Sequence, residues 1–169
     1  MKANLLLSCF VVAGVVATAP VQAQSAQAQS AASGQPIPRF VTLNADEVNM
    51  RSGPGVRYPV EWVYQRRYMP LEVIAEHDTW RKVRDVEGTE GWIHRAMLSS
   101  RRSIVVEAEE IIMRRDPDDG SPVMARLATG MVAVVEKCDT AWCEVRASGY
   151  EGWIARKDVW GLYDSEMIN

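Results

Sequence analysis

Cysteine and histidine are scarce in this sequence. Its 169 residues include three cysteines and two histidines, His77 and His94. A structural zinc site takes four closely spaced ligands, and a cysteine nucleophile takes a histidine base beside it. The two histidines lie in a predicted turn and just after a predicted strand, far from the cysteines. We therefore expect no metal, no cofactor and no catalytic residue in this chain, and we do not expect an enzyme.

The sequence also lacks an excess of positive charge. Its formal net charge is −3, and its arginines are scattered among carboxylates. Nucleic-acid-binding proteins normally carry a basic patch or stripe, so we expect no nucleic-acid partner. We interpret the isolated pairs of like charge as solvated surface and loop positions: Arg66-Arg67, Arg101-Arg102, Arg114-Arg115, Glu109-Glu110 and Asp118-Asp119.

A long hydrophobic run occurs only at the N-terminus. Lys2 precedes an apolar run at residues 5–16, and residues 21–23 place small side chains where a signal peptidase reads them. This pattern predicts a signal peptide, residues 1–23, cleaved after Ala23; an uncleaved anchor is the alternative. The run is short for a transmembrane helix and nothing later replaces it. We expect a periplasmic or secreted protein whose mature chain does not insert into a membrane.

Apolar periodicity is absent from the segment that follows. Residues 24–38 consist largely of glutamine, alanine, serine, glycine and proline, a composition typical of a flexible linker. We also expect residues 164–169 to form a polar C-terminal tail.

What the chain does contain, from Phe40 onward, is a series of short apolar runs. They are β-branched or aromatic and are bounded by glycine, proline, aspartate or asparagine, a pattern that predicts strands. In the first half the predicted extended segments are residues 40–43, 48–50, 58–64, 71–75, 80–86 and 91–94. No window shows a sustained helical period, and we expect at most one helical turn, at residues 96–98. The fold class is therefore all-β.

The second half repeats the first at an offset of 61 to 63 residues. Trp80-x-x-Val83 recurs as Trp142-x-x-Val145, and Glu-Gly-Trp-Ile at residues 90–93 recurs at residues 151–154. The order is kept while the offset drifts by two residues, as small loop insertions would cause. We infer two copies of one unit, residues 39–100 and 103–163, separated by a polar arginine and serine segment.

These motifs, with Val-Asn-Met-Arg-Ser-Gly-Pro-Gly at residues 48–55, resemble the bacterial SH3 (SH3b-like) family, in which a strand leads into an Arg-Ser-Gly-Pro loop. The resemblance covers both units and implies two tandem, partly open five-stranded β-barrels with a binding function. The second copy departs from the pattern at its loop, where Asp116 and Asp118 replace Gly53 and Gly55.

Two cysteines, Cys138 and Cys143, flank a four-residue connection between strand-like runs. In a hairpin these positions face each other at a separation suited to a disulfide, and the signal peptide implies an oxidising compartment. Loop-closure entropy gives so small a ring about 2 kcal/mol. In the first unit we assign His77 and Arg81 to the corresponding places, so we expect a disulfide in the second unit alone.

Two tryptophans occupy the same place in the repeat, Trp80 and Trp142. Strand alternation turns Val83 and Val145 toward the cores and both tryptophans toward solvent. An exposed tryptophan at a repeated position indicates a binding platform; the alternative is a tryptophan that caps the barrel rim. Trp92 and Trp153, in the Gly-Trp-Ile elements, are expected to be structural.

The candidate ligand-binding residues are Arg51, Tyr58, Trp80 and Trp142. We expect a shallow groove between the loop at residues 51–57 and the Trp80 hairpin, with Tyr58 lining it or packing in its own turn. The resemblance implies recognition of the peptidoglycan peptide or another cell-envelope component; the alternative is an adaptor that recruits an envelope protein. Because the first unit keeps its glycine loop, we expect it to be the unit that binds.

Overall fold

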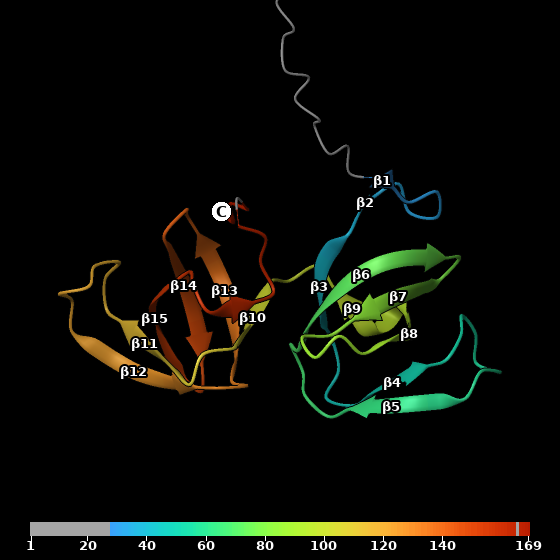
Figure 1. Ribbon diagram of the computed structural model, residues 1–169, viewed down its shortest axis with the longest axis horizontal. Coiled ribbons are helices and arrows are strands. Elements are labelled where there is room, and N and C mark those ends of the chain that lie inside the picture. Colours follow the sequence, from blue (N-terminus) through green and yellow to red (C-terminus); the bar gives the residue numbers. More distant parts are fainter. Residues whose placement is uncertain (1–27, 165) are drawn as a thin grey trace, which may run out of the picture.

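The computed structural model describes residues 28–164 and 166–169, and these fold into two β-barrels (Figure 1). The predicted signal peptide and residues 24–27 of the predicted linker lie outside the described residues. Within the described part, no helix is long and apolar enough to cross a membrane. The all-β prediction is confirmed, and the helical turn expected at residues 96–98 is the 3₁₀ turn η1 (Arg95–Met97).

Each barrel is formed by one antiparallel sheet. The first sheet contains β3 (Arg39–Leu43), β4 (Val48–Arg51), β5 (Val60–Tyr64), β6 (Pro70–His77), β7 (Trp80–Arg84), β8 (Glu90–His94) and β9 (Leu98–Ser99). The second contains β10 (Ser103–Val106), β11 (Glu110–Arg114), β12 (Val123–Ala128), β13 (Val132–Cys138), β14 (Trp142–Ala147), β15 (Tyr150–Ala155) and β16 (Val159–Trp160). The short strands raise the number in each sheet to seven, where the family pattern implied five.

The two sheets have the same strand order. The first runs β5-β4-β8-β7-β6-β3-β9, and the second runs β12-β11-β15-β14-β13-β10-β16. Each strand of the first barrel therefore has a counterpart at the same place in the second. The repeat inferred from the sequence is a repeat of structure.

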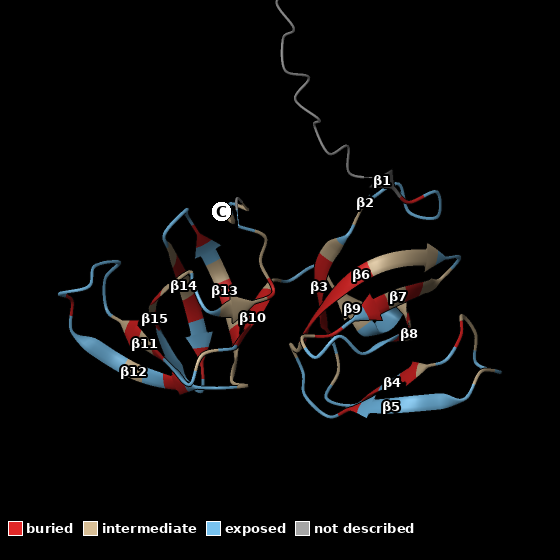
Figure 2. Ribbon diagram, in the orientation of Figure 1, coloured by how far each residue is buried: buried red, intermediate tan, exposed pale blue. Residues whose placement is uncertain are grey.

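Each barrel encloses its own hydrophobic core, because the sheet folds over side chains that most of its strands contribute. In the first barrel, Met50 of β4 packs in one cluster with Val73 of β6 and Ile93 of β8. In the second, Met113 of β11 shares a cluster with Val135 and Ile154. Along β4, β8 and β11, buried residues alternate with partly or fully exposed ones (Figure 2), because successive side chains of a strand point to opposite faces.

Two glycines at equivalent positions allow this folding over. A Cβ atom added at Gly91 would lie 2.5 Å from Cγ of Met50, and one added at Gly152 would lie 2.5 Å from the carbonyl oxygen of Arg114. In the second barrel the backbone of β11 therefore crosses β15 at a distance that only glycine permits, and in the first barrel the Met50 side chain occupies the space beside Gly91.

Both segments expected to be loose are folded against the barrels. Strands β1 (Ala28–Gln29) and β2 (Pro36–Ile37) pair with each other. The hydroxyl of Ser30 donates a hydrogen bond of 2.5 Å to the carboxylate of Glu76, so residues 28–38 do not behave as the linker we expected. At the other end, the backbone of Ile168 pairs with that of Cys138.

Side chains join the two barrels. The ring of Phe40 on β3 lies 4.9 Å from that of Trp160 and 4.7 Å from that of Tyr163, measured between centroids. The guanidinium of Arg102 lies 5.7 Å from the Phe40 ring, and the Tyr163 hydroxyl donates to Glu72 at 2.9 Å. The barrels are therefore held in one relative orientation by packing as well as by the connecting segment.

Candidate functional site

In each barrel, one face of a hairpin points away from the core. The hairpin is β7–β8 in the first barrel and β14–β15 in the second, and we call these two faces the outer faces. On β7, Arg81 and Val83 are buried, whereas Trp80 and Lys82 are partly exposed. On β14, Cys143 and Val145 are buried and Trp142 is partly exposed. The predicted orientation of both tryptophans is confirmed; their role in binding a ligand stays a prediction.

Three strands contribute to the first outer face. Arg51 of β4 pairs with Trp92 of β8, which pairs in turn with Lys82 of β7. Trp80 pairs with His94 in the next row, and their rings meet edge to face at 5.4 Å. The face is thus a row of aromatic and basic side chains across adjacent strands. Trp92 was expected to be structural, yet it is partly exposed on this face, while its neighbour Ile93 is buried.

Arg51 and Tyr58 come together, but both are engaged within their own loop. The Arg51 guanidinium donates to the carbonyl oxygens of Val56 at 3.2 Å and of Tyr58 at 2.7 Å. The Tyr58 ring fills the space above Gly53, where a Cβ atom would lie 2.5 Å from it. These contacts fix the shape of the Gly-Pro-Gly loop beside Trp92. Tyr58 packs in its own turn, which was the alternative to lining a groove. Ligand binding by Arg51 or Tyr58 stays a prediction.

The second outer face is hollowed around Trp142. A pocket of about 280 Å³ is lined by this tryptophan together with Ile112, Arg114, Asp119 and Lys157. The sequence pattern favoured the first barrel as the binding one, yet this pocket belongs to the second. The sequence analysis did not single out Ile112 and Lys157, because only the folded sheet brings them next to Trp142. The signal for Ile112 was present in the alternation of β11, where Ile111 is buried and Ile112 is partly exposed.

A short hydrogen-bonded turn holds Trp142 in place. The Oδ1 atom of Asp139 accepts the backbone N–H groups of Trp142 at 2.8 Å and Ala141 at 2.7 Å. These two bonds stabilise the carboxylate, so they lower the pKa of Asp139. The turn stays charged and closed near neutral pH, which fixes the start of β14.

The predicted disulfide is present. Cys138 and Cys143 are paired across β13 and β14, with their Cα atoms 4.1 Å apart. The counterpart in the first barrel differs from our assignment of His77 and Arg81. Glu76 pairs with Arg81 at that position in the register, while His77 pairs with Trp80. An offset of 62 residues holds on both strands of this hairpin, and it maps Glu76 onto Cys138.

Glu76 is the centre of a buried ion cluster in place of that disulfide. Its side chain exposes 0% of its surface, and its Oε1 atom lies 2.5 Å from Arg39 and 3.0 Å from Arg81. Burial acts to raise the pKa of Glu76, but hydrogen bonds from Ser30, Ser33 and Arg39 and the charge of Arg39 outweigh it and lower the pKa to about 2. Glu76 therefore remains a carboxylate at every ordinary pH.

Among residues 28–164 and 166–169, no group of three or more histidine, cysteine, aspartate or glutamate side chains is placed to hold a metal ion.

Comparison with known proteins identifies the family. The family model for the bacterial SH3 domain matches the chain twice, at residues 44–100 and 107–161. The chain belongs to the bacterial SH3 domain family. Each matched range covers its barrel apart from the first strand, β3 or β10, and both outer faces lie within the matched ranges.

A relative is the "Putative N-acetylmuramoyl-L-alanine amidase YrvJ" of Bacillus subtilis (strain 168). It is 25% identical over 130 residues, which are 69% of this chain and 24% of the relative. The chain thus spans about a quarter of that protein's length.

Two solved structures also match. They are NlpC2 and NlpC1 from Trichomonas vaginalis, at 11% and 12% identity, with TM-scores of 0.34 each. The matches cover 75% and 79% of this chain and 49% of each of those chains. At these scores the likeness carries no argument about function.

Proposed function

We propose that this chain is an exported, non-enzymatic protein that binds the peptidoglycan of the bacterial cell wall through its outer faces. Bacterial SH3 domains generally bind peptidoglycan. The relative from Bacillus subtilis is named as an amidase of a cell-wall bond, and the match covers 69% of this chain. Both findings favour the cell wall as the target. The residues of the outer faces would then determine which part of the wall is bound.

The observation that carries the proposal is the repeated register of aromatic and basic residues. Arg51 pairs with Trp92 beside Trp80 in the first barrel, and Arg114 pairs with Trp153 beside Trp142 in the second. Tryptophan offers a large, rigid contact area at little entropic expense, and it suits the apolar faces of sugars and peptide side chains.

The number of sites also suits this target. Peptidoglycan is a repeating polymer, and a chain with two equivalent faces in a defined relative orientation can engage two repeats at once. The second contact is then intramolecular, so the overall affinity exceeds that of either face. The inter-barrel packing of Phe40 supports this arrangement because it fixes the two faces relative to each other.

Sedimentation with insoluble, purified peptidoglycan tests the proposal. We expect Trp80→Ala and Trp142→Ala each to lower the retained fraction, by roughly tenfold in affinity for a central tryptophan, and the double variant to lose retention. Trp62→Ala is the matched control, since Trp62 is exposed on edge strand β5 and pairs with the core residue Met50. No retention of the wild-type protein would overturn the proposal, and release of soluble wall fragments would show an enzyme instead.

A second function, the recruitment of an envelope protein, is favoured by a different surface. Strands β5 and β12 lie at free edges of their sheets, and they expose Val60, Trp62 and Val63, and Val123 and Met124. An edge strand with apolar side chains can accept an additional strand from a partner. In that case Trp62→Ala would abolish co-purification of the partner, while Trp80→Ala would not.

A further inference from the structure

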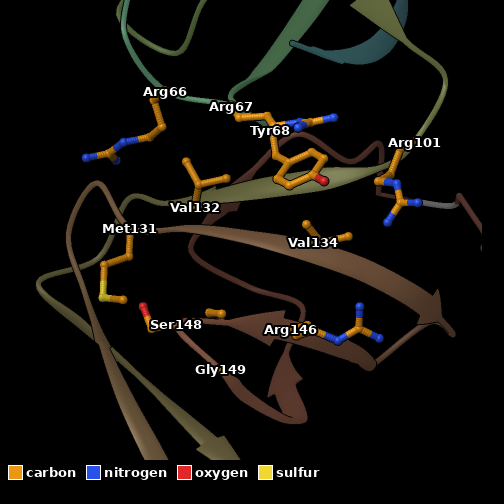
Figure 3. Close-up of a pocket in the computed structure, with 11 residues that line it drawn as sticks. Arg66, Arg67, Tyr68, Arg101, Met131, Val132, Val134, Arg146, Ser148 and Gly149 are labelled. Carbon is orange, nitrogen blue, oxygen red and sulfur yellow. The ribbon is translucent and has the colours of Figure 1, made fainter. Parts of the chain in front are cut away.

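A cleft lies between the two barrels, on neither outer face; we call it the inter-barrel cleft (Figure 3). Its volume is about 560 Å³, which is within the range of small-ligand sites. One wall comes from the β5–β6 loop of the first barrel, with Arg66, Arg67 and Tyr68, and from Arg101 in the connecting segment. The other wall comes from β13 and the β14–β15 turn of the second barrel. Both barrels must be present to form it.

The lining of the cleft is strongly positive in a chain whose net charge is −3. It includes four arginines and no acidic residue among those that the structure describes. Arg146 is neutralised by Glu136 at 3.0 Å and Glu151 at 3.4 Å. Arg66, Arg67 and Arg101 have no carboxylate within ion-pair distance in the described part of the chain. Residues that we interpreted from the sequence as isolated surface doublets therefore gather at one place.

Tyr68 adopts a backbone conformation that disfavours a tyrosine. Its φ angle is +63°, in the left-handed region where a side chain is strained. The equivalent residue of the second barrel is Gly130, with φ of +76°. The correspondence is structural, because the N–H of Tyr68 donates to the carbonyl of Leu43 at 3.0 Å and that of Gly130 donates to the carbonyl of Val106 at 2.8 Å. Only the first barrel places a side chain at this turn.

The strained residue carries the ring around which the cleft is arranged. The guanidinium of Arg67 lies 5.2 Å and that of Arg101 lies 5.7 Å from the centroid of the Tyr68 ring. The hydroxyl of Ser103 donates to the Tyr68 carbonyl at 2.6 Å, which fixes this turn from the side of the second barrel. Backbone strain that the surrounding structure maintains is concentrated at functional sites, so Tyr68 points to a role for the cleft.

The cleft combines cations with an apolar floor. Val132 and Val134 are partly exposed on β13; Val134 lies below the Tyr68 ring, Val132 lies to its side, and Met131 lies at one end (Figure 3). Guanidinium groups bind carboxylates through paired, charge-assisted hydrogen bonds. An anion with small apolar groups attached would fill both parts of the cleft. A bare phosphate would satisfy the arginines and leave the floor uncovered.

We propose that the inter-barrel cleft binds the free terminal carboxylate of a short peptide with small side chains, with Arg67 and Arg101 holding the carboxylate and Val132 and Val134 contacting the side chains. This site is distinct from both outer faces, and it goes beyond peptidoglycan binding because it requires only the peptide end. Arg66 is a positioning residue, since it donates to the carbonyl of Gly130 in the second barrel.

The test is an NMR titration of the protein with trialanine, either with a free carboxylate or with a C-terminal amide, at constant ionic strength. The free peptide is expected to shift the amide signals of Tyr68, Ser148 and Gly149 saturably, and the amide is expected to bind at least tenfold more weakly. Equal binding of the two peptides would overturn the proposal. Inorganic phosphate that competes more tightly than the peptide would overturn it in favour of a phosphate site.

Two variants separate binding from folding. Arg101→Gln is expected to weaken the peptide at least tenfold, while Arg57→Gln, at an exposed arginine 5.3 Å from the Tyr58 ring, should leave it unchanged. Tyr68→Gly is expected to weaken the peptide equally while keeping or raising the Tm, because glycine accepts this φ angle. Unchanged peptide affinity in Tyr68→Gly contradicts the proposal. Failure of the peptide titration leaves wall sedimentation intact, and loss of sedimentation in the Trp80 and Trp142 variants leaves the titration intact.

Discussion

At one position of the repeat, the two barrels use different chemistry to join the same pair of strands. The second barrel has the covalent bond between Cys138 and Cys143, and the first has Glu76 beside Arg81. Arg39 and Ser30 add two further contacts to the Glu76 carboxylate. A buried charge that loses its partners is strongly destabilising, so the first barrel depends on this carboxylate remaining ionised.

The first prediction concerns Glu76→Gln. The folded-state pKa of about 2 lies below the ordinary value of 4.5, so the ionised group contributes stability above pH 4.5, and this contribution is lost as the pH falls from 4.5 to 2. The shift corresponds to roughly 3 kcal/mol. We expect the variant to lose about that much stability at pH 7 and to show a flatter pH dependence between pH 4.5 and 2 in urea unfolding.

Glu90→Gln is the matched control for this experiment. Glu90 also forms an ion pair, with Lys82 at 2.5 Å, but both side chains are more than a third exposed. Exposed ion pairs contribute little to stability, so this variant should unfold like the wild type. An equal pH slope in Glu76→Gln and in the wild type would contradict the assignment.

Side-chain direction was predictable where strands alternate, as at Trp80 and Trp142. The pairing of residues across strands was less predictable. His77 was assigned the place of Glu76, which is a slip of one residue in register, and such a slip exchanges the two faces of a strand. Tyr68 carried a usable signal, since an offset of 62 residues aligns it with Gly130, and a glycine facing a tyrosine in a repeat indicates an unusual backbone.

At the scale of elements, the β13–β14 hairpin has a special place in the second barrel. Cys138 and Cys143 belong to its hydrophobic core, and the backbone N–H of Cys138 donates to the carbonyl of Ile168 at 2.8 Å. The disulfide therefore closes the hairpin at the point where the C-terminal residues are anchored.

The second prediction is that replacing both cysteines by alanine destabilises the second barrel by about 2 kcal/mol, from the entropy of a small closed loop, with a further loss for the core volume removed. Chemical denaturation followed by the NMR signals of the Trp142 and Trp153 indole N–H groups measures this change. Dithiothreitol should lower the stability of the wild type and leave the double variant unaffected. A wild type indifferent to reductant would contradict the prediction.

Most strands could be predicted from residue type, because runs such as Pro70–His77 and Trp80–Arg84 are β-branched, aromatic and bounded by turns. The fold of residues 28–38 could not. Their composition is that of a linker, and they are held by strand pairing and by contacts such as the one from Ser30 to a carboxylate distant in the sequence. Local pattern carries no information about such a contact.

At the scale of the whole molecule, one aromatic side chain dominates the junction of the barrels. Phe40 is 7% exposed, and it lies between the rings of Trp160 and Tyr163 of the second barrel. The hydroxyl of Tyr163 is bonded to Glu72; burial and this bond to a carboxylate raise the pKa of Tyr163. The phenol therefore stays protonated and remains a donor across the junction.

The third prediction is that Phe40→Ala uncouples the barrels. Removing a buried phenylalanine costs about 3 kcal/mol or more. Scanning calorimetry should show one cooperative transition in the wild type and two in the variant, since each barrel has its own core. Val56→Ala, at a side chain that is 81% exposed, is the control. A single, unshifted transition in Phe40→Ala would show that the packing of Phe40 does not couple the barrels.

The inter-barrel cleft shows the limit of sequence reasoning at this scale. Arg66, Arg67 and Arg101 were visible as charges, but their convergence depends on how two folded units pack. That packing rests on Phe40 and on partners far along the chain, and the repeat pattern describes each unit without describing their contact.

The exchange of an ion cluster for a disulfide makes the two halves of the molecule sensitive to different environments. Strong acid removes a stabilising charge from the first half and leaves the covalent bond of the second intact. A thiol reductant opens that bond and does not affect Glu76. A protein with the same stabilising contact in both halves would lose it twice to a single stress, whereas this one loses it in only one half under either condition.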